Sequence, residues 1–294
     1  MSKIQSTILL GPSGFIGSKV LELVRLRKEL SKNTFVVSTP RNDVIKKSPS
    51  LTFQNVENAQ EKLQVYDLCE RVYVINCAAH RAPKQDIQNE YGNYTYPIKI
   101  LNNLLVSKKH ITWYQLESYW QFCQGDTPLP EYVFWKNKFR FEAQNTATTA
   151  NLSYVSLVLP HVIGVNDDKK RYLNRNFLSL ISHKDILITN PDNKFYLCDN
   201  DDVSQYLIQQ AYREQFVDKS ISNLFGYHEI SLIDLFKLFK DISKSTSKFT
   251  VNFNESHLNP ILDTGLQSPL VPIGEFKSKN LDVTLYNILE WLRN

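Results

Sequence analysis

A tyrosine and a lysine four residues apart are the pair in this chain best suited to acid–base chemistry. They stand in the segment Tyr132-Val133-Phe134-Trp135-Lys136, within a helix predicted over 132–147, so both side chains lie on one helix face. A free phenol has a pKa of about 10, and a neighbouring ammonium lowers such a pKa. The phenol could then exchange a proton with an alkoxide or alcohol as hydride moves between carbon and a nicotinamide. An exposed helical pair without chemistry is the alternative.

Three glycines at three-residue spacing follow the first apolar run of the chain. Residues 8–20 read Ile-Leu-Leu-Gly-Pro-Ser-Gly-Phe-Ile-Gly-Ser-Lys-Val, and an apolar helical pattern continues after them. Gly11 permits a tight turn, Gly14 lets backbone N–H groups approach phosphate, and Gly17 lets a helix pack closely on a strand. This order predicts a site for a dinucleotide pyrophosphate, although a flexible turn would look similar. The turn residues expected to contact the dinucleotide are Gly11, Ser13, Gly14, Phe15, Ile16 and Gly17.

The bulk composition argues against several kinds of partner. The 294 residues carry a net charge of +4 without a dense run of Lys and Arg, which argues against a nucleic-acid partner. The four cysteines show no CxxC spacing and no His at metal-ligand distances, so we expect reduced thiols and no metal site. Neither a signal-peptide pattern nor an apolar run of about 18–20 residues occurs, which predicts a cytoplasmic protein without a membrane partner.

Short apolar runs alternate with helical patterns through the first two-thirds of the chain. This alternation predicts parallel strands joined by crossover helices, that is, an α/β protein with a doubly wound parallel sheet. Strands are expected at 34–39, 51–55, 72–79, 111–117 and 154–159. Helices are expected at 89–107, 132–147 and 176–182, from Asp201 onward, and at 231–242 and 280–292. Beyond Gly164 the pattern loosens, which predicts a smaller discontinuous α/β domain.

With these features together, the chain resembles the extended short-chain dehydrogenases/reductases over nearly its full length. This family contains NAD(P)-dependent sugar-nucleotide epimerases, dehydratases and reductases. Residues 11–17 are close to its GxxGFIG turn, residues 157–164 are similar to its RxxxVYG segment, and Asp201-Asp202-Val203 matches a helix start expected to be structural. The resemblance implies an NADP-binding Rossmann domain over 1–165, to which 195–215 return. It implies a substrate-binding domain over 166–194 and 216–294.

The resemblance also implies roles for individual residues. The third catalytic residue would be Ser118, whose hydroxyl would hold the substrate oxygen near the phenol of Tyr132, while Lys136 holds the nicotinamide ribose. Glu117 departs from the small or hydroxylic residues usual before that serine. Asn93 matches the asparagine with which the family commonly starts the helix motif after the fourth strand. Cofactor contacts beyond the glycine turn are expected from Cys77, Ala78, Ala79, Asn93, Tyr132, Lys136 and Pro160.

The end of the second predicted strand favours NADP(H) over NAD(H). NAD-dependent members of the family place an acidic residue there, which binds the ribose hydroxyls, whereas this chain has Ser38-Thr39-Pro40-Arg41. An aspartate would repel a 2′-phosphate, but Arg41 can clamp it while Ser38 and Thr39 donate hydrogen bonds. The alternative is that Arg41 is a solvated turn residue that stacks on adenine.

The residues after Ser118 narrow the reaction that the resemblance implies. The 4,6-dehydratases follow their catalytic Thr with Asp-Glu, which eliminate water, and Tyr119-Trp120 stand in those places here. The segment 118–136 resembles the CDP-abequose and CDP-paratose synthases, which reduce the 4-keto group of a CDP-6-deoxyhexulose for O-antigen sugars of lipopolysaccharide. We therefore predict NADPH-dependent reduction of the 4-keto group of a nucleoside-diphosphate 4-keto-6-deoxysugar. The alternatives are a nucleotide-sugar epimerase that recycles tightly bound NAD and a non-catalytic NADP-binding sensor or scaffold.

Polar residues after the fourth and sixth strands are candidates for binding the substrate. Cations after the sixth strand would face the cleft and could bind a diphosphate, although each could equally be a solvated surface residue. The candidates for the diphosphate are Arg171, Arg175 and Asn176. His80 and Arg81, just after the fourth strand, are candidates for lining the sugar pocket, with a packed or exposed histidine as the alternative, and Ser118 at the end of the fifth strand would hold the substrate oxygen. Family members often dimerise through a four-helix bundle, so the resemblance also allows a second copy of this chain as a partner in a homodimer.

Overall fold

Eight parallel strands form the central sheet of the protein, in the order β13-β10-β6-β5-β4-β1-β2-β3. The computed structural model describes residues 5–27, 34–38, 52–55, 68–81, 86–122, 130–212, 221–224, 226–253, 271–272 and 279–294. The strands are β1 (Ser6–Leu10), β2 (Thr34–Ser38), β3 (Thr52–Asn55), β4 (Arg71–Asn76), β5 (His110–Ser118), β6 (Leu152–Leu159), β10 (Ile221–Leu224) and β13 (Val271–Pro272). The strand order reverses between β1 and β4, where ligands bind in doubly wound sheets. The predicted fold class is thereby confirmed.

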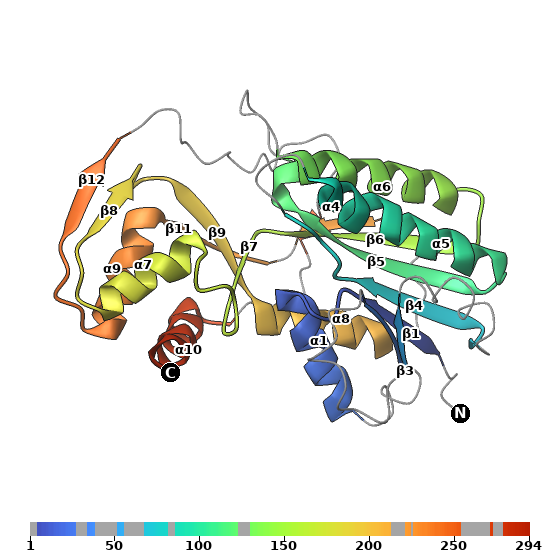
Figure 1. The fold of residues 1–294 in the computed structure, drawn as a ribbon, viewed down its shortest axis with the longest axis horizontal. Coiled ribbons are helices and arrows are strands. Elements are labelled where there is room, and N and C mark those ends of the chain that lie inside the picture. Colours follow the sequence, from blue (N-terminus) through green and yellow to red (C-terminus); the bar gives the residue numbers. More distant parts are fainter. Residues whose placement is uncertain are drawn as a thin grey trace.

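Helices cover both faces of this sheet (Figure 1). One face carries α1 (Phe15–Leu26) and α8 (Asn200–Tyr212), and the other carries α4 (Ile87–Glu90), the π-helical turn η1 (Tyr91–Thr95), α5 (Tyr96–Val106) and α6 (Glu131–Ala147). Successive strand side chains point to opposite faces, so Leu9 and Tyr114 pack in the core with α1 and α8. Ile8 and Trp113 belong to the core under α5 and α6. Burial on both faces explains why these strands read as continuous apolar runs.

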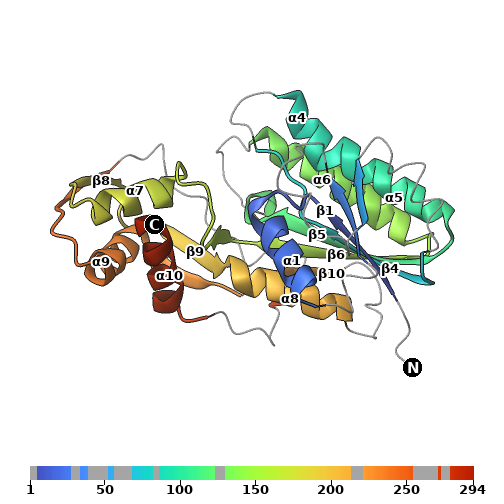
Figure 2. The same ribbon diagram turned by 60° about the horizontal axis from the view of Figure 1, so that its bottom comes forward.

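A second region with its own core lies beside the large sheet (Figure 2). Its elements are β7 (His161–Ile163), α7 (Tyr172–Ile181), β8 (Ile186–Thr189), β9 (Lys194–Asp199), β11 (His228–Ser231), α9 (Leu232–Ser243), β12 (Phe249–Asn252) and α10 (Leu281–Arg293). The strands form one sheet of order β11-β9-β7 and one pair, β12 with β8. The rings of Phe177 and Phe239 stack at 3.9 Å in its core. Ser231 caps α9 by accepting a hydrogen bond from the backbone N–H of Asp234 at 3.2 Å.

The pairing of the later strands shows which sheet each of them joins. β10 and β13 lie within the range assigned to the substrate domain, yet both pair in the large sheet. β9 begins at Lys194, one residue before the range 195–215 expected to return to the nucleotide domain, and it pairs with β7 and β11. Strands this short carry too little pattern to reveal which sheet they join. The helix predicted from residue 89 begins two residues earlier, at Ile87, because Asp86 caps it by accepting a hydrogen bond from the Gln88 N–H.

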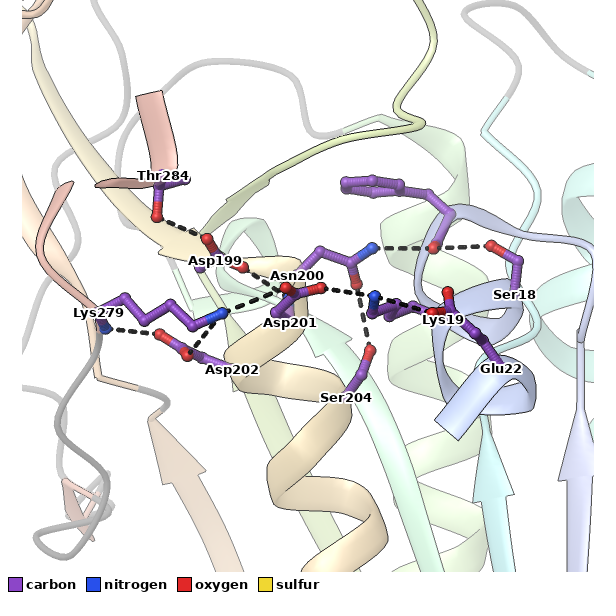
Figure 3. A network of polar contacts seen from close by, with 11 residues as sticks. Ser18, Lys19, Glu22, Asp199, Asn200, Asp201, Asp202, Ser204, Lys279 and Thr284 are labelled. Atoms are coloured by element: carbon purple, nitrogen blue, oxygen red, sulfur yellow. Dashed lines mark hydrogen bonds and ion pairs between the residues drawn. The ribbon is translucent and has the colours of Figure 1, made fainter. Parts of the chain in front are cut away.

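A network of polar contacts joins the glycine turn to the second region (Figure 3). Asn200, at the start of α8, donates a hydrogen bond of 3.0 Å to the carbonyl oxygen of Phe15. The carboxylate of Asp201 lies 3.2 Å from the ammonium of Lys19 on α1 and 3.2 Å from that of Lys279, just before α10. Asp202 accepts from the backbone N–H of Lys279 at 2.7 Å. The acidic pair therefore holds three helices together.

Candidate active site

The glycine turn lies directly against the residues that follow β4. Gly11 has a φ of +71°, and a Cβ there would lie 2.6 Å from the backbone of Ala78. A Cβ on Gly17 would lie 2.0 Å from the carbonyl oxygen of Gly11, so neither position has room for a side chain. Gly14 differs because it is exposed. A Cβ added there would lie 3.5 Å from the nearest protein atom, the Gly11 carbonyl oxygen, which is an ordinary contact distance. The backbone at Gly14 is therefore open to a ligand.

The two segments predicted to contact a dinucleotide meet at this turn. Cys77 donates its backbone N–H to the carbonyl oxygen of Leu10 at 3.0 Å, and Ala78 donates to the Asn76 side chain at 3.0 Å, which places 77–79 beside the turn. Ser13 is exposed at the tip of the turn, whereas Phe15 and Ile16 are half-buried. Burial raises the pKa of the Cys77 thiol to about 12, with Lys136 opposing the shift, so the thiol stays protonated.

The end of β5 and the first turns of α6 bring together Ser118, Tyr132 and Lys136. The Ser118 Oγ lies 3.3 Å from the Tyr132 Oη, so the two hydroxyl groups form a hydrogen bond. Lys136 is only 4% exposed and donates from Nζ to the carbonyl oxygen of Leu116 at 2.7 Å. Gln121 accepts from the Ser118 N–H at 2.8 Å, which fixes the serine backbone. The tyrosine and the lysine predicted to share one helix face thus reach the same strand end.

The groups around Lys136 shift its pKa in opposite directions. Burial lowers the pKa of Lys136, the charge of Glu117 raises it, and Arg81 lowers it. The Arg81 guanidinium lies 5.7 Å from the centre of the Tyr132 ring. Glu117 is buried on the α6 side of the sheet, where its Oε1 accepts from the Tyr154 hydroxyl at 2.9 Å. Burial raises the pKa of Glu117, and the charges of Lys136 and Arg140 oppose that shift.

The other residues predicted to bind the cofactor are Asn93, Pro160, Ser38, Thr39 and Arg41. Asn93 is buried and donates from its side chain to the carbonyl oxygens of His80 and Asn89, both at 2.8 Å, so it holds the loop after β4. Pro160 is buried between β6 and β7. Thr39 and Arg41 lie outside the described residues, and only the backbone of Ser38 is described, at the end of β2.

A cavity of about 550 Å³ lies in the second region and reaches Arg81. Its polar lining residues are Arg81, His161, Asp167, Arg171, Asn174, Thr189 and Asn193. Arg171, immediately before α7, donates from Nη1 to both carboxylate oxygens of Asp167, at 2.8 and 2.9 Å. A cavity of this size can hold a small molecule, and its arginines suit an anionic one.

Four of the predicted substrate residues do not line this cavity, and one of them is Ser118, which contacts Tyr132 at the end of β5. Arg175 is exposed one helical turn after Arg171. Asn176 donates its side chain to the Tyr172 carbonyl oxygen at 2.8 Å, and Asn174, buried on the other side of the helix, takes its place in the lining. The His80 ring contacts Asp86 at 3.2 Å rather than the cavity. The positions of Arg175 and Asn176 follow from which face α7 turns toward the core, which the short polar loop before α7 does not reveal in the sequence.

Sequence reasoning missed His161, which lies between the residue after β5 and the cavity. Its Nε2 lies 3.2 Å from the hydroxyl of Tyr119, the residue after Ser118, and its ring packs against Phe195 at 4.9 Å. Its Nδ1 is buried without a hydrogen-bond partner. Burial lowers the pKa of His161 to about 3, so its imidazole is neutral. The signal was its place directly after Pro160, within the segment already singled out.

Comparisons with known proteins show the fold of the chain. No protein-family model and no curated protein sequence matches it. The UDP-glucose 4-epimerase of Thermotoga maritima matches with a TM-score of 0.71 at 16% identity, over 98% of this chain and 99% of that one. The UDP-N-acetylglucosamine 4-epimerase of Methanobrevibacter ruminantium matches with a TM-score of 0.75 at 15% identity, over 99% of both chains. This chain has their fold.

A dehydratase has the same fold. The dTDP-glucose 4,6-dehydratase of Bacillus anthracis, solved in complex with NAD, matches with a TM-score of 0.73 at 14% identity, over 98% of this chain and 96% of that one. Within the described part of the chain, no three His, Cys, Asp or Glu side chains gather as ligands of a metal ion would. None of the helices described combines the length and apolarity needed to cross a membrane.

Proposed function

We propose that this protein is an NADPH-dependent enzyme that reduces the 4-keto group of a nucleoside-diphosphate 4-keto-6-deoxysugar. The observation that carries the proposal is the contact of 3.3 Å between Ser118 Oγ and Tyr132 Oη, with Lys136 one helical turn on. Arg81, whose guanidinium lies 5.7 Å from the centre of the Tyr132 ring, also lines the cavity together with Arg171. The CDP-abequose and CDP-paratose synthases, which segment 118–136 resembles, define the preferred substrate class.

The residues of the glycine turn fit a dinucleotide. The N–H groups at the start of α1 and the open backbone at Gly14 suit a pyrophosphate, which helix N-termini bind through their N–H groups and dipole. The segment 77–79 lies beside this turn and would face the ribose that Lys136 binds. A reduced nicotinamide supplies the hydride when bound. We favour NADP(H) over NAD(H) because of Ser38, Thr39 and Arg41.

The chain's own residues then bind the substrate oxygen and supply its proton. Ser118 donates a hydrogen bond to the keto oxygen and holds it beside the Tyr132 hydroxyl. Tyr132 releases its proton to that oxygen as negative charge develops on it, and the ammonium of Lys136 stabilises the phenolate that remains. Arg81 and Arg171 bind the diphosphate at the wall of the cavity, where Asp167 orients the Arg171 guanidinium.

The placement of carboxylates favours reduction over elimination. Tyr119 and Trp120 follow Ser118, and the Tyr119 hydroxyl contacts His161. Among the described residues that line the cavity, Asp167 is the only carboxylate, and it is paired with Arg171. Glu117 does not line the cavity, and its Oε1 accepts from the Tyr154 hydroxyl under α6. The fold shared with 4-epimerases supports epimerisation as the second candidate.

A panel of nucleotide sugars tests the proposed reaction. We expect the purified protein to consume NADPH with a CDP- or dTDP-4-keto-6-deoxyhexose, measured as loss of the reduced-nicotinamide absorbance. NADH should be used about tenfold less efficiently, because an arginine–phosphate contact contributes at least about 1.4 kcal/mol. Arg41→Ala should remove most of this preference. Interconversion of 4-epimers by protein that retains NAD through purification would assign an epimerase instead, and NADPH binding without consumption would assign a sensor.

Arg171 provides a separate test of the substrate site. We expect Arg171→Ala to raise KM for the nucleotide sugar about tenfold or more, because a charge-assisted contact to the diphosphate is lost, while the NADPH dissociation constant stays unchanged. Steady-state kinetics and NADPH fluorescence measure the two quantities. Lys170→Ala removes an exposed cation of the same loop and serves as the matched control. An equal rise of KM in both variants would mean that only the overall positive field matters.

A further inference from the structure

Glu117 is a buried carboxylate directly before the proposed catalytic serine. It is 2% exposed, and β5 places it on the α6 side of the sheet, level with Val158 of β6. Its Oε1 accepts from the Tyr154 hydroxyl at 2.9 Å, and its Oε2 is buried without a hydrogen-bond partner. A carboxylate is costly to bury unless a cation compensates it. The proposed reaction, as described above, does not use this group.

The charges of two α6 cations act on this carboxylate. Lys136 and Arg140 are four residues apart and therefore share the helix face that carries Tyr132. Lys136 reaches the carbonyl oxygen of Leu116, the residue before Glu117, at 2.7 Å. Arg140 has a buried Nε without a hydrogen-bond partner, and its guanidinium lies 4.6 Å from the centre of the Phe122 ring. Without an ionised Glu117, both cations would lack this buried counter-charge.

We propose that Glu117 is a positioning residue whose buried carboxylate is the counter-charge that keeps the ammonium of Lys136, held at the neighbouring Leu116 carbonyl oxygen, in its charged form beside Tyr132. Burial alone drives a lysine toward its neutral form, which can neither stabilise a phenolate nor bind a ribose as a cation. The hydroxyl of Tyr154 holds the carboxylate in position. This inference rests on the proposed function, because Lys136 matters through its charge beside Tyr132.

Several titratable groups face this pair from the surrounding elements. Burial is the largest influence on Lys136 and lowers its pKa; Glu117 raises that pKa, Arg81 lowers it, and Cys77 raises it. Arg140 and Tyr154 act on Glu117 from α6 and β6. Because the charge of Glu117 raises the pKa of Lys136, we expect removal of that charge to lower this pKa.

The experiment compares Glu117→Gln with the wild-type protein in two measurements. In the first, NMR of protein containing isotope-labelled lysine follows the titration of Lys136, whose signal is assigned by its loss in Lys136→Arg. We expect the midpoint to fall by about one pH unit or more in Glu117→Gln and to stay near the wild-type value in Glu117→Asp. In the second, the high-pH limb of the kcat profile should move in the same direction, and Glu117→Asp should restore it.

Further variants separate charge from packing. Glu117→Leu fills the buried space without a charge and should reproduce the shift if Glu117→Gln does not fold. Tyr154→Phe keeps the carboxylate and should shift the midpoint less than Glu117→Gln does. A lower Tm in Glu117→Gln with an unchanged Lys136 midpoint would overturn the inference, because the role would then be structural. If the wild-type protein turns over no substrate, the proposed function fails, and the NMR titration still decides the role of Glu117.

Discussion

Replacing Tyr132 by Phe is expected to lower kcat for the keto sugar by about 10²–10⁴-fold, the usual contribution of a general acid. The change removes the hydroxyl that lies 3.3 Å from the Ser118 Oγ and leaves the ring in its buried position. The NADPH dissociation constant and the Tm should stay close to the wild-type values. Single-turnover kinetics with saturating NADPH measure the chemical step directly and exclude slow product release.

Tyr94→Phe is the matched control for this variant. It also removes one tyrosine hydroxyl, but that hydroxyl donates to Glu142 at 2.8 Å and lies outside the proposed site. We expect Tyr94→Phe to keep wild-type turnover. If Tyr132→Phe retained more than about a tenth of the wild-type kcat, another group would have to supply the proton, and the role of Tyr132 would be rejected.

Replacing Gly17 by Ala is expected to abolish tight NADPH binding and to destabilise the protein. Its Cβ would lie 2.0 Å from the Gly11 carbonyl oxygen, a backbone atom that can move only if the turn itself moves. Forcing such overlap into a packed site costs about 1–3 kcal/mol, and a displaced turn no longer presents its N–H groups to phosphate. Thermal unfolding and NADPH fluorescence titration measure the two effects, and we expect the dissociation constant to rise about tenfold or more.

Gly14→Ala separates phosphate binding from folding. The backbone of Gly14 has a φ of −76°, which alanine adopts easily, and the added methyl group would meet its nearest protein atom at 3.5 Å. We therefore expect an unchanged Tm together with weaker NADPH binding, because the methyl group stands where the pyrophosphate would approach. Unchanged NADPH binding in both glycine variants would place the cofactor elsewhere.

Local patterns in the sequence were sufficient to predict the main elements of the large sheet. The apolar run before Gly11, the helix that contains Tyr132 and Lys136, and the helix that begins at the Asp201 pair were all expected, and the structure confirms these elements. Strands buried on both faces appear as apolar runs, and the spacing along a helix decides which side chains share a face. The short strands β7–β13 were not predicted, because their pairing depends on partners far away in the chain.

Which of the candidate residues meet depends on the tertiary structure. The sequence by itself determined that the chain has a glycine turn followed by a helix and a Tyr-Lys pair on a later helix. It did not determine that Arg171 rather than Arg175 lines the cavity, or that Glu117 is buried beneath α6. Those positions depend on how strands and helices separated by many residues pack against each other. Spacing along the chain determines local geometry, whereas contacts such as Ser118 with Tyr132 exist only after that packing is complete.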